Sequence, residues 1–443
     1  MTSTLEKNTR LKGGVGLTGV VMLGAGTAIG VSIFSVLAPA AEVAGSGLLI
    51  AVFLSAVPMV FFAIAYAYLA SALPLTGASY EWPRRFIHPQ VGFLIAWMRI
   101  LSNVGAMTVL ATVLINYINM AFDLPLKPAM AAILTAVFAL NYVGVKVAAL
   151  AQTILMIMLL VVLSIFVTTG IPYSSSLTIG PLLVEGWPAV IATVPLMITL
   201  FLGIESAVEI GEEVRDPQRT IPQGIALAIL LTTIVYVAVA ATALALLGPD
   251  RLAASAAPLI DAAREPLGKW ALPLILSAAV ISIVKSLNSL AMIFSRALFA
   301  MGRTGAFPVS LARIHPRFGT PHIAVLVAYV FAMSGLFLPS NLIFLLLAVN
   351  IPTMLKYLAC SLCAVRVVDH HPEIAKGAKL ELTPGVVRFV GYSGAVLAVG
   401  IIVAGLGADW RPYALVAGWV ALGIIYWWMI AVRSSREPLA GKG

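Results

Sequence analysis

The feature that most constrains this 443-residue sequence is a succession of twelve apolar segments separated by mostly short polar connections. About 20 consecutive apolar residues are enough to cross the hydrocarbon core of a bilayer as an α-helix. Hydrophobic residues make up 61% of the chain and charged residues only 10%, against about 45–50% and about 25% in soluble domains. The sequence therefore predicts an all-α, multi-pass integral membrane protein. We expect spans at residues 13–41, 46–72, 90–121, 128–144, 147–170, 187–211, 222–247, 271–295, 321–338, 341–365, 386–406 and 412–432.

The formal net charge of +9 is distributed unevenly over the connections between these spans. With the N-terminus inside, most Lys and Arg residues fall in cytoplasmic segments, which is the pattern of the positive-inside rule. The outside segments hold only Lys127, Arg251, Arg264, Lys269 and Arg411. We therefore expect residues 1–12 and 433–443 to be cytoplasmic, and no cleaved leader, because the first apolar run is too long for a signal-peptide core. The basic residues then report topology and do not indicate a nucleic-acid partner.

The first apolar run, residues 13–41, is free of charge and longer than one crossing requires. Its middle holds three glycines and two hydroxyl residues, namely Gly24, Gly26, Thr27, Gly30 and Ser32. Glycine lets the backbone leave helical dihedrals and lets a ligand approach the main chain. We expect the helix to break near Gly30, so that the following amides bind an anion such as a substrate carboxylate. A plain helix packed through small residues is the alternative.

The sixth span carries a second interruption, where the apolar run reaches Gly203 and then the acidic Glu205. The chain continues through a charged stretch to Asp216 and Pro217, which is good turn chemistry, and Pro222 suits a helix start. Two interrupted apolar segments at corresponding points of two halves are the best sequence indication of a transport site.

Several short motifs, in this order along the chain, resemble those of the amino acid–polyamine–organocation transporters. The segments that carry the resemblance are Ile29–Phe34, Pro74–Tyr80, Gly92–Trp97, Asn141–Lys146, Thr199–Pro222 and Ser295–Pro308. The resemblance implies a leucine-transporter-like fold of twelve transmembrane helices in which helices one and six are broken. It also implies a 5+5 arrangement of two inverted repeats, at residues 13–170 and 187–366, followed by two peripheral helices within 386–432.

The resemblance implies a secondary transporter. Its apolar walls favour neutral amino acids as substrates. We expect transport to be coupled to protons and independent of sodium. An exchanger for cationic amino acids or polyamines is the second hypothesis, because Glu205 could bind a further amine. A ligand-binding membrane sensor without transport is a third. We expect no enzyme activity, cofactor or metal; Cys360 and Cys363 are interpreted as packing residues in the tenth span. The expected location is the bacterial inner membrane, and the oligomeric state stays open.

In the resembling transporters, exposed amides hold the substrate carboxylate and exposed carbonyls hold the amine. Carried over to this chain, the amides around Val31 and Ser32 are expected to bind the carboxylate. The carbonyls expected to bind the amine are those of Ala28, Thr199, Leu200 and Leu202. The full set of predicted substrate-binding residues is Ala28, Ile29, Gly30, Val31, Ser32, Thr199, Leu200 and Leu202.

Three charged residues within the spans need partners, because charges at membrane depth are rare and usually paired. Glu205 and Glu209 are four residues apart, so they share one helical face beyond the second break. We predict that Glu205 helps to sense or carry protons and that Arg99 pairs with one of the two carboxylates. The alternatives are that Arg99 extends toward the cytoplasm and that Glu209 simply faces it.

Lys285 is the predicted coupling residue in the eighth span. Many of the resembling transporters carry a lysine in helix five, near position 159, where this chain reads Met156-Ile157-Met158-Leu159-Leu160. We predict that Lys285 replaces it and contacts carbonyls around Gly26 or Thr27 and the Ser282 hydroxyl. Burial disfavours the charged form of a lysine, which makes Lys285 a candidate proton carrier. A salt bridge to Glu205 and extension toward the surface are the alternatives, and Lys356 is a competitor for the same role.

Overall fold

The computed structural model describes residues 14–30, 32–119, 122–174, 179–255, 257–337, 342–406 and 410–436. Within these ranges the chain is helical and forms no β-strand, only two isolated bridges. Eleven of the described helices are long and apolar enough to cross a membrane, which confirms the predicted all-α membrane fold. The predicted terminal segment 1–12, residues 437–443 of the predicted terminal segment 433–443, and the predicted ligand Val31 lie outside the described residues.

The first half of the chain contains one interrupted helix followed by four long helices and one short one. The elements are α2 (Leu17–Ala28), α3 (Ser32–Ser35), α4 (Leu37–Ala44), η1 (Gly45–Gly47), α5 (Leu48–Ala72), α6 (Ala78–Phe86), α7 (Pro89–Ile118), α8 (Leu126–Val143) and α9 (Val145–Ser174). Helix α6 lies outside the predicted spans. It is amphipathic, with Tyr80 and Trp82 buried and Arg85 half-exposed.

The second half begins with another interrupted helix and ends with two long helices, of which one packs against α5 and the other against α7. The first elements are α10 (Gly186–Ile198), η2 (Thr199–Phe201), η3 (Ile204–Glu209), η4 (Gly211–Glu213), α11 (Pro217–Ala253), α12 (Pro258–Leu267), η5 (Gly268–Trp270) and α13 (Ala271–Arg303). The remainder are η6 (Val309–Ala312), α14 (His322–Ser334), η7 (Gly335–Phe337), α15 (Leu342–His370), α16 (Pro372–Lys376), α17 (Pro384–Leu406) and α18 (Arg411–Arg436).

The ninth predicted span, 321–338, is shorter in the structure than the other eleven. It consists of α14 and the single 3-10 turn η7, so regular α-helix ends at Ser334. The connection between the predicted spans 222–247 and 271–295 is not a simple loop, because it contains the ten-residue helix α12. The twelve-span topology and the two inverted repeats stay predictions.

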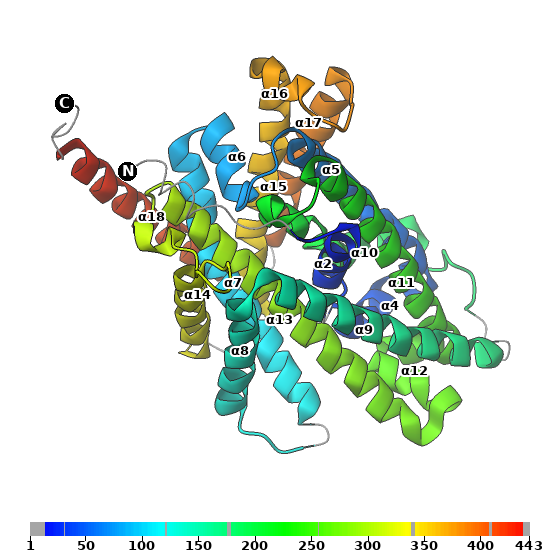
Figure 1. Cartoon of the computed structure of the whole chain (residues 1–443). Coiled ribbons are helices and arrows are strands. Elements are labelled where there is room, and N and C mark those ends of the chain that lie inside the picture. The colour runs from blue at the N-terminus through cyan, green and yellow to red at the C-terminus, as the bar shows by residue number, and fades with distance from the viewer. Residues whose placement is uncertain are drawn as a thin grey trace.

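Both predicted helix breaks are present, and they lie against each other. Helix α2 ends at Ala28, and Ile29 leaves the helical region with φ −72° and ψ 74°. After η2, Leu202 is extended and Gly203 has a φ of +96°, a left-handed conformation that favours glycine. A Cβ atom placed on Gly24 would lie 2.7 Å from the Ile204 carbonyl oxygen, so α2 and η3 touch through backbone. Figure 1 shows α2 inside the bundle, where it packs against α9, α11 and α13.

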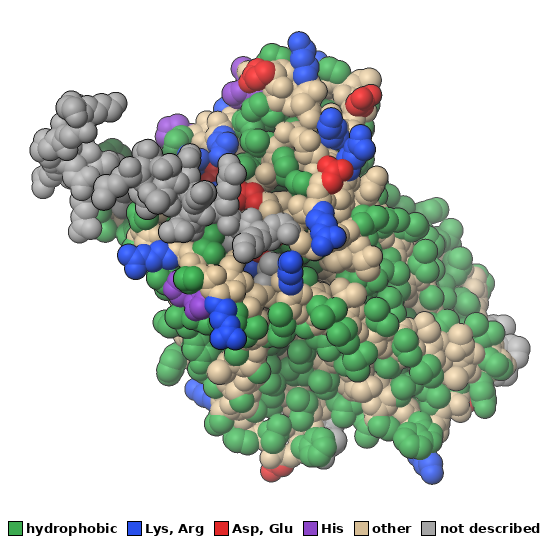
Figure 2. Space-filling view, viewed as in Figure 1, with side chains coloured by type: hydrophobic (Ala, Val, Ile, Leu, Met, Phe, Trp, Pro, Cys, Tyr) green, Lys and Arg blue, Asp and Glu red, His purple; other side chains and the backbone are tan. Residues whose placement is uncertain are grey.

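The surface separates into an apolar belt and a charged end. Figure 2 shows hydrophobic side chains over a broad side of the molecule, with charged side chains gathered where α6 and α16 lie. On α9, the exposed residues include Leu150, Ile154, Ile157 and Val161. Large exposed apolar side chains at helical spacing are stable when lipid covers them. The belt is therefore the lipid-facing surface of the fold.

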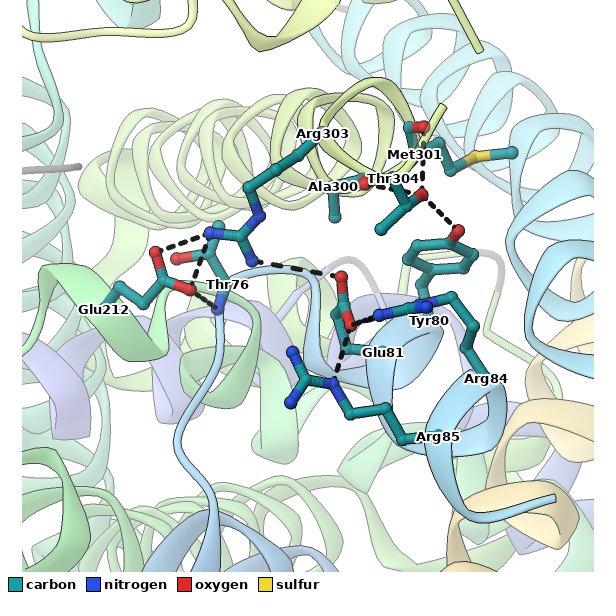
Figure 3. A network of polar contacts seen from close by, with 10 residues as sticks. All are labelled: Thr76, Tyr80, Glu81, Arg84, Arg85, Glu212, Ala300, Met301, Arg303 and Thr304. Atoms are coloured by element: carbon teal, nitrogen blue, oxygen red, sulfur yellow. Dashed lines mark hydrogen bonds and ion pairs between the residues drawn. The ribbon is translucent and has the colours of Figure 1, made fainter. Parts of the chain in front are cut away.

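A network of ion pairs joins three elements at the α6 end of the molecule. Glu81 is buried and accepts hydrogen bonds from Arg84 and Arg85 on its own helix, at 2.8 and 3.1 Å. Arg303, at the end of α13, donates to both carboxylate oxygens of Glu212 at 2.9 Å and approaches Glu81 at 3.9 Å. Figure 3 shows how these side chains converge from α6, η4 and α13. The network therefore ties α6 to η4 and to the end of α13.

A second ion pair, Arg296 with Glu213, is entirely buried and carries a stability prediction. The guanidinium donates from two nitrogens to both carboxylate oxygens, at 2.9 and 3.2 Å. Removing one partner of a buried pair leaves an uncompensated charge and costs about 3–5 kcal/mol. We expect Arg296→Leu to lower the melting temperature of the detergent-solubilised protein strongly. The double variant Arg296→Leu/Glu213→Leu should recover most of that loss.

The exposed pair Arg388–Asp369 provides the matched control, since its side chains are 51% and 26% exposed. Exposed pairs contribute about 0–1 kcal/mol, so Arg388→Leu should change the melting temperature little. A single Arg296 variant as stable as the double variant would contradict the assignment of a buried charge at Glu213.

Candidate functional site

A cavity of about 250 Å³ lies between the two breaks and the neighbouring helices α7, α13 and α15. This volume is below the ~300–1,000 Å³ of pockets for drug-sized ligands, so it suits a small solute. Five of the predicted substrate residues line it, namely Ala28, Gly30, Ser32, Thr199 and Leu202. The cavity therefore forms where the two broken helices expose their backbone.

Two further predicted substrate residues do not line this cavity. The side chains of Ile29 and Leu200 are fully buried in the hydrophobic core. The Ile29 carbonyl accepts hydrogen bonds from Lys285 and Ser282. The Ala28 carbonyl accepts from Gly30 N–H and from the Tyr236 hydroxyl, both at 2.7 Å. A carbonyl has two lone pairs, so an incoming amine at Ala28 would compete with Tyr236.

Lys285 lies against the broken end of α2 and is fully buried. Its ammonium donates to the carbonyl oxygens of Gly26 and, at 2.6 Å, of Ile29. Ser282, one turn earlier on α13, donates to the same Ile29 carbonyl at 2.8 Å. Among the described residues Lys285 forms no ion pair, and both acceptors of its ammonium are backbone carbonyls. Lys285 therefore neither pairs with Glu205 nor extends toward the surface.

Glu205 is paired with Lys356 instead. The Lys356 ammonium lies 2.5 Å from one carboxylate oxygen, and the Tyr357 hydroxyl donates to the other at 2.8 Å. Glu205 and Lys356 both line the cavity, and their side chains are each only 6% exposed. The competitor named for the role of Lys285 therefore lies at a different place, beside Glu205.

Arg99 on α7 forms a short ion pair with Glu209, and its side chain also lines the cavity. Glu209 is buried at 2% exposure and does not face the surface. Arg99 therefore lies beside one of the two carboxylates, as expected from the sequence. Of the cavity-lining residues, two carry positive charge and one, Glu205, carries negative charge.

A chain of buried amide side chains that was not predicted lies beside the first break, outside the lining of the cavity. Gln152 on α9 accepts from Asn288 at 3.2 Å, and Asn288 also accepts from Asn141 at 2.9 Å. Gln152 lies close to Gly26, where a Cβ atom would come within 2.3 Å of its Nε2 atom. A sequence signal did exist, because uncharged amides inside apolar spans usually hydrogen-bond across helices. Spacing alone did not indicate which of them face the break.

Apolar side chains that line the cavity include those of Ala106, Val109, Leu290 and Ile293, and uncharged polar ones also line it, namely Ser102, Asn103, Ser206, Ser286, Asn350 and Thr353. The lining of the cavity therefore combines the residues of the two breaks, charged and amide side chains, and apolar side chains. Such a site can bind a small molecule that has a zwitterionic head and an apolar side chain.

Comparison with known proteins identifies the family. The model of the family described as amino acid permease matches residues 15–432. An uncharacterized transporter of Mycobacterium tuberculosis is 36% identical over 317 residues, which is 71% of each chain. The branched-chain amino acid permease BcaP of Bacillus subtilis is 25% identical over 448 residues, covering 96% of this chain and 94% of its own. The methylthioribose transporter of the same organism is 25% identical over 437 residues, covering 94% and 93%. A match over nearly its whole length shows that this chain belongs to the amino acid permease family of the amino acid–polyamine–organocation transporters.

Proposed function

We propose that this protein is a proton-coupled, sodium-independent transporter of neutral amino acids in a bacterial inner membrane, with both termini cytoplasmic. The observation that carries the proposal is the buried Lys285 ammonium on the carbonyls of Gly26 and Ile29. A buried charge held there by backbone carbonyls is costly, and loss of its proton would remove that cost.

The proposed substrate head group binds at the two breaks. Its carboxylate is held by amides after Gly30, including that of Ser32, and its amine by carbonyls at Leu202 and Thr199. Both breaks contribute lining residues to the cavity, which supports this division. At Ala28 the amine would replace the Tyr236 hydroxyl. The apolar walls favour an aliphatic side chain, and the relative named as a branched-chain amino acid permease is consistent with that choice.

The proposed coupling step is a change in the contact between α13 and α2. Protonated Lys285 ties Gly26 and Ile29 to α13 through its ammonium. The neutral amine donates weaker hydrogen bonds, because charge-assisted bonds are roughly twice as strong as neutral ones. Deprotonation would therefore loosen the end of α2 and let it move relative to α13, which is the kind of motion that alternating access requires. Glu205 is proposed to assist, since it lies across the second break.

Uptake into proteoliposomes tests this function. We expect labelled leucine to accumulate inside when the external medium is the more acidic, and a protonophore to abolish the accumulation. Replacing sodium by choline throughout should leave the accumulation unchanged. Protein-free liposomes and a reversed pH gradient are the controls.

Three results would contradict the proposal. Dependence on sodium would reject the coupling ion. Exchange without net accumulation would assign an antiporter. Thermal stabilisation by leucine without any uptake would assign a sensor.

A further inference from the structure

The pair Glu205–Lys356 occupies the wall of the cavity, and its geometry is that of a filled cation site. Both oxygens of the Glu205 carboxylate have a partner, Lys356 at 2.5 Å and the Tyr357 hydroxyl at 2.8 Å. The Lys356 ammonium also lies 4.5 Å from the centre of the Tyr357 ring and 5.7 Å from that of Tyr66. Carboxylate and aromatic faces together are the surroundings that bind ammonium groups in proteins.

We propose that Lys356 is a specificity-determining residue, whose side chain occupies at Glu205 the position that the cationic side chain of a substrate would need. The inference rests on the proposed function, because it concerns the side-chain end of an amino acid bound in the same cavity. Glu205 is then a latent binding site for cations, and Lys356 keeps it closed to lysine-like substrates.

The physical reason is competition between a tethered and a free ammonium. Lys356 is attached to α15 beside the carboxylate, so its effective concentration there far exceeds that of a dissolved solute. An incoming cation would have to displace it and would leave a second positive charge nearby, which like-charge repulsion opposes. Arg99 adds a further positive group to the same cavity. A neutral aliphatic side chain meets none of these obstacles.

The distribution of the other charges supports the same reading. Glu209 is engaged by Arg99 and does not line the cavity, so Glu205 is the carboxylate that faces the bound substrate among the described residues. Both charged members of the Glu205 pair have their side chains only 6% exposed. Removal of the Lys356 charge would therefore leave a buried carboxylate in need of a cation.

The test compares uptake of labelled L-lysine and L-leucine by the full-length protein in proteoliposomes. The Lys356→Met variant keeps a long, unbranched apolar side chain in place of the lysine stem but removes the positive charge. We expect the ratio of lysine to leucine uptake to rise by about ten-fold or more. Without the Lys356 ammonium at Glu205, the affinity for lysine should rise relative to the affinity for leucine, and about 1.4 kcal/mol corresponds to a ten-fold change. The double variant Lys356→Met/Glu205→Gln should lose the gain. Lys269→Met, at an exposed position in η5, is the matched control and should leave the ratio unchanged.

A Lys356→Met protein that carries leucine with an unchanged ratio would overturn the proposal, and so would a gain that persists in the double variant. If the Lys356→Met protein does not insert into the membrane, Lys356→Gln is used in its place, and the same two uptake results would overturn the proposal. Failure of the proposed function is distinct, since the wild-type protein would then take up no amino acid. In that case calorimetry decides: lysine binding to purified Lys356→Met but not to wild type upholds the inference, and binding to neither rejects it.

Discussion

Lys285→Ala is expected to abolish accumulation driven by a pH gradient. A difference of one pH unit supplies about 1.4 kcal/mol per proton, enough for about ten-fold accumulation by a carrier that moves one proton with each substrate. The variant lacks the ammonium that bridges α13 to the carbonyls of Gly26 and Ile29, so substrate should only equilibrate. The measurement is the ratio of internal to external leucine in sodium-free proteoliposomes.

Two further variants separate the proton from the charge. Lys285→Arg keeps a positive group that stays protonated at all working pH values, so it should bind substrate without proton-driven accumulation. Lys269→Ala makes the same chemical change as Lys285→Ala at an exposed position and should behave as wild type. A Lys285→Ala protein that still concentrates leucine on a pH gradient would remove Lys285 from the mechanism.

Gly203→Ala is expected to reduce uptake by more than ten-fold, because this position excludes a side chain for two independent reasons. Its φ of +96° lies in the left-handed region, where non-glycine residues are strained by about 1–3 kcal/mol. A Cβ atom would also lie 2.5 Å from Thr27 Cγ2, on the other broken helix. Either relaxation, of Gly203 or of Thr27, moves backbone that lines the cavity. The measurement is initial leucine uptake, normalised to the amount of protein in the membrane.

Gly400→Ala is the matched control for this substitution. Gly400 lies within helix α17, and apart from its chain neighbours and the adjacent backbone of that helix, no described atom lies within 4 Å of where its Cβ would be. Alanine is also the better helix former, so this variant should insert and transport normally. Wild-type uptake by Gly203→Ala would show that the second break does not shape the substrate site.

The apolar segments and the helix breaks were predictable from the sequence because each depends on local chemistry. Long runs without charge can satisfy their backbone hydrogen bonds in a bilayer only as helices, and most of the predicted spans correspond to one. Gly203 adopts a conformation that glycine favours, so the residue type itself marked the second break. The α-helix of the ninth span ends at Ser334, before the predicted end of the span, because apolar composition does not fix where a helix ends.

The partners of the buried charges could be predicted only in part. Lys285, Ser282 and Ser286 share one face of α13 at a spacing of three or four residues, and that spacing is visible in the sequence. Spacing does not state the depth and rotation at which α13 meets α2, and these decide that the ammonium reaches Gly26 and Ile29. The roles assigned to these residues in coupling stay predictions.

The two buried lysines show most clearly what the sequence could predict and what it could not. Lys285 and Lys356 were both candidates for the position beside the first break, because each is a single cation in an otherwise apolar span, and Lys285 had a salt bridge to Glu205 as its alternative. The packing of α15 beside the second break brings Lys356 to Glu205, whereas the packing of α13 against α2 brings Lys285 to backbone carbonyls. The sequence by itself determined that the chain spans a membrane, where its helices break and which charges need partners. Only the tertiary structure decided which partner each charge has, since residues far apart in sequence meet through helix packing, which no local pattern encodes.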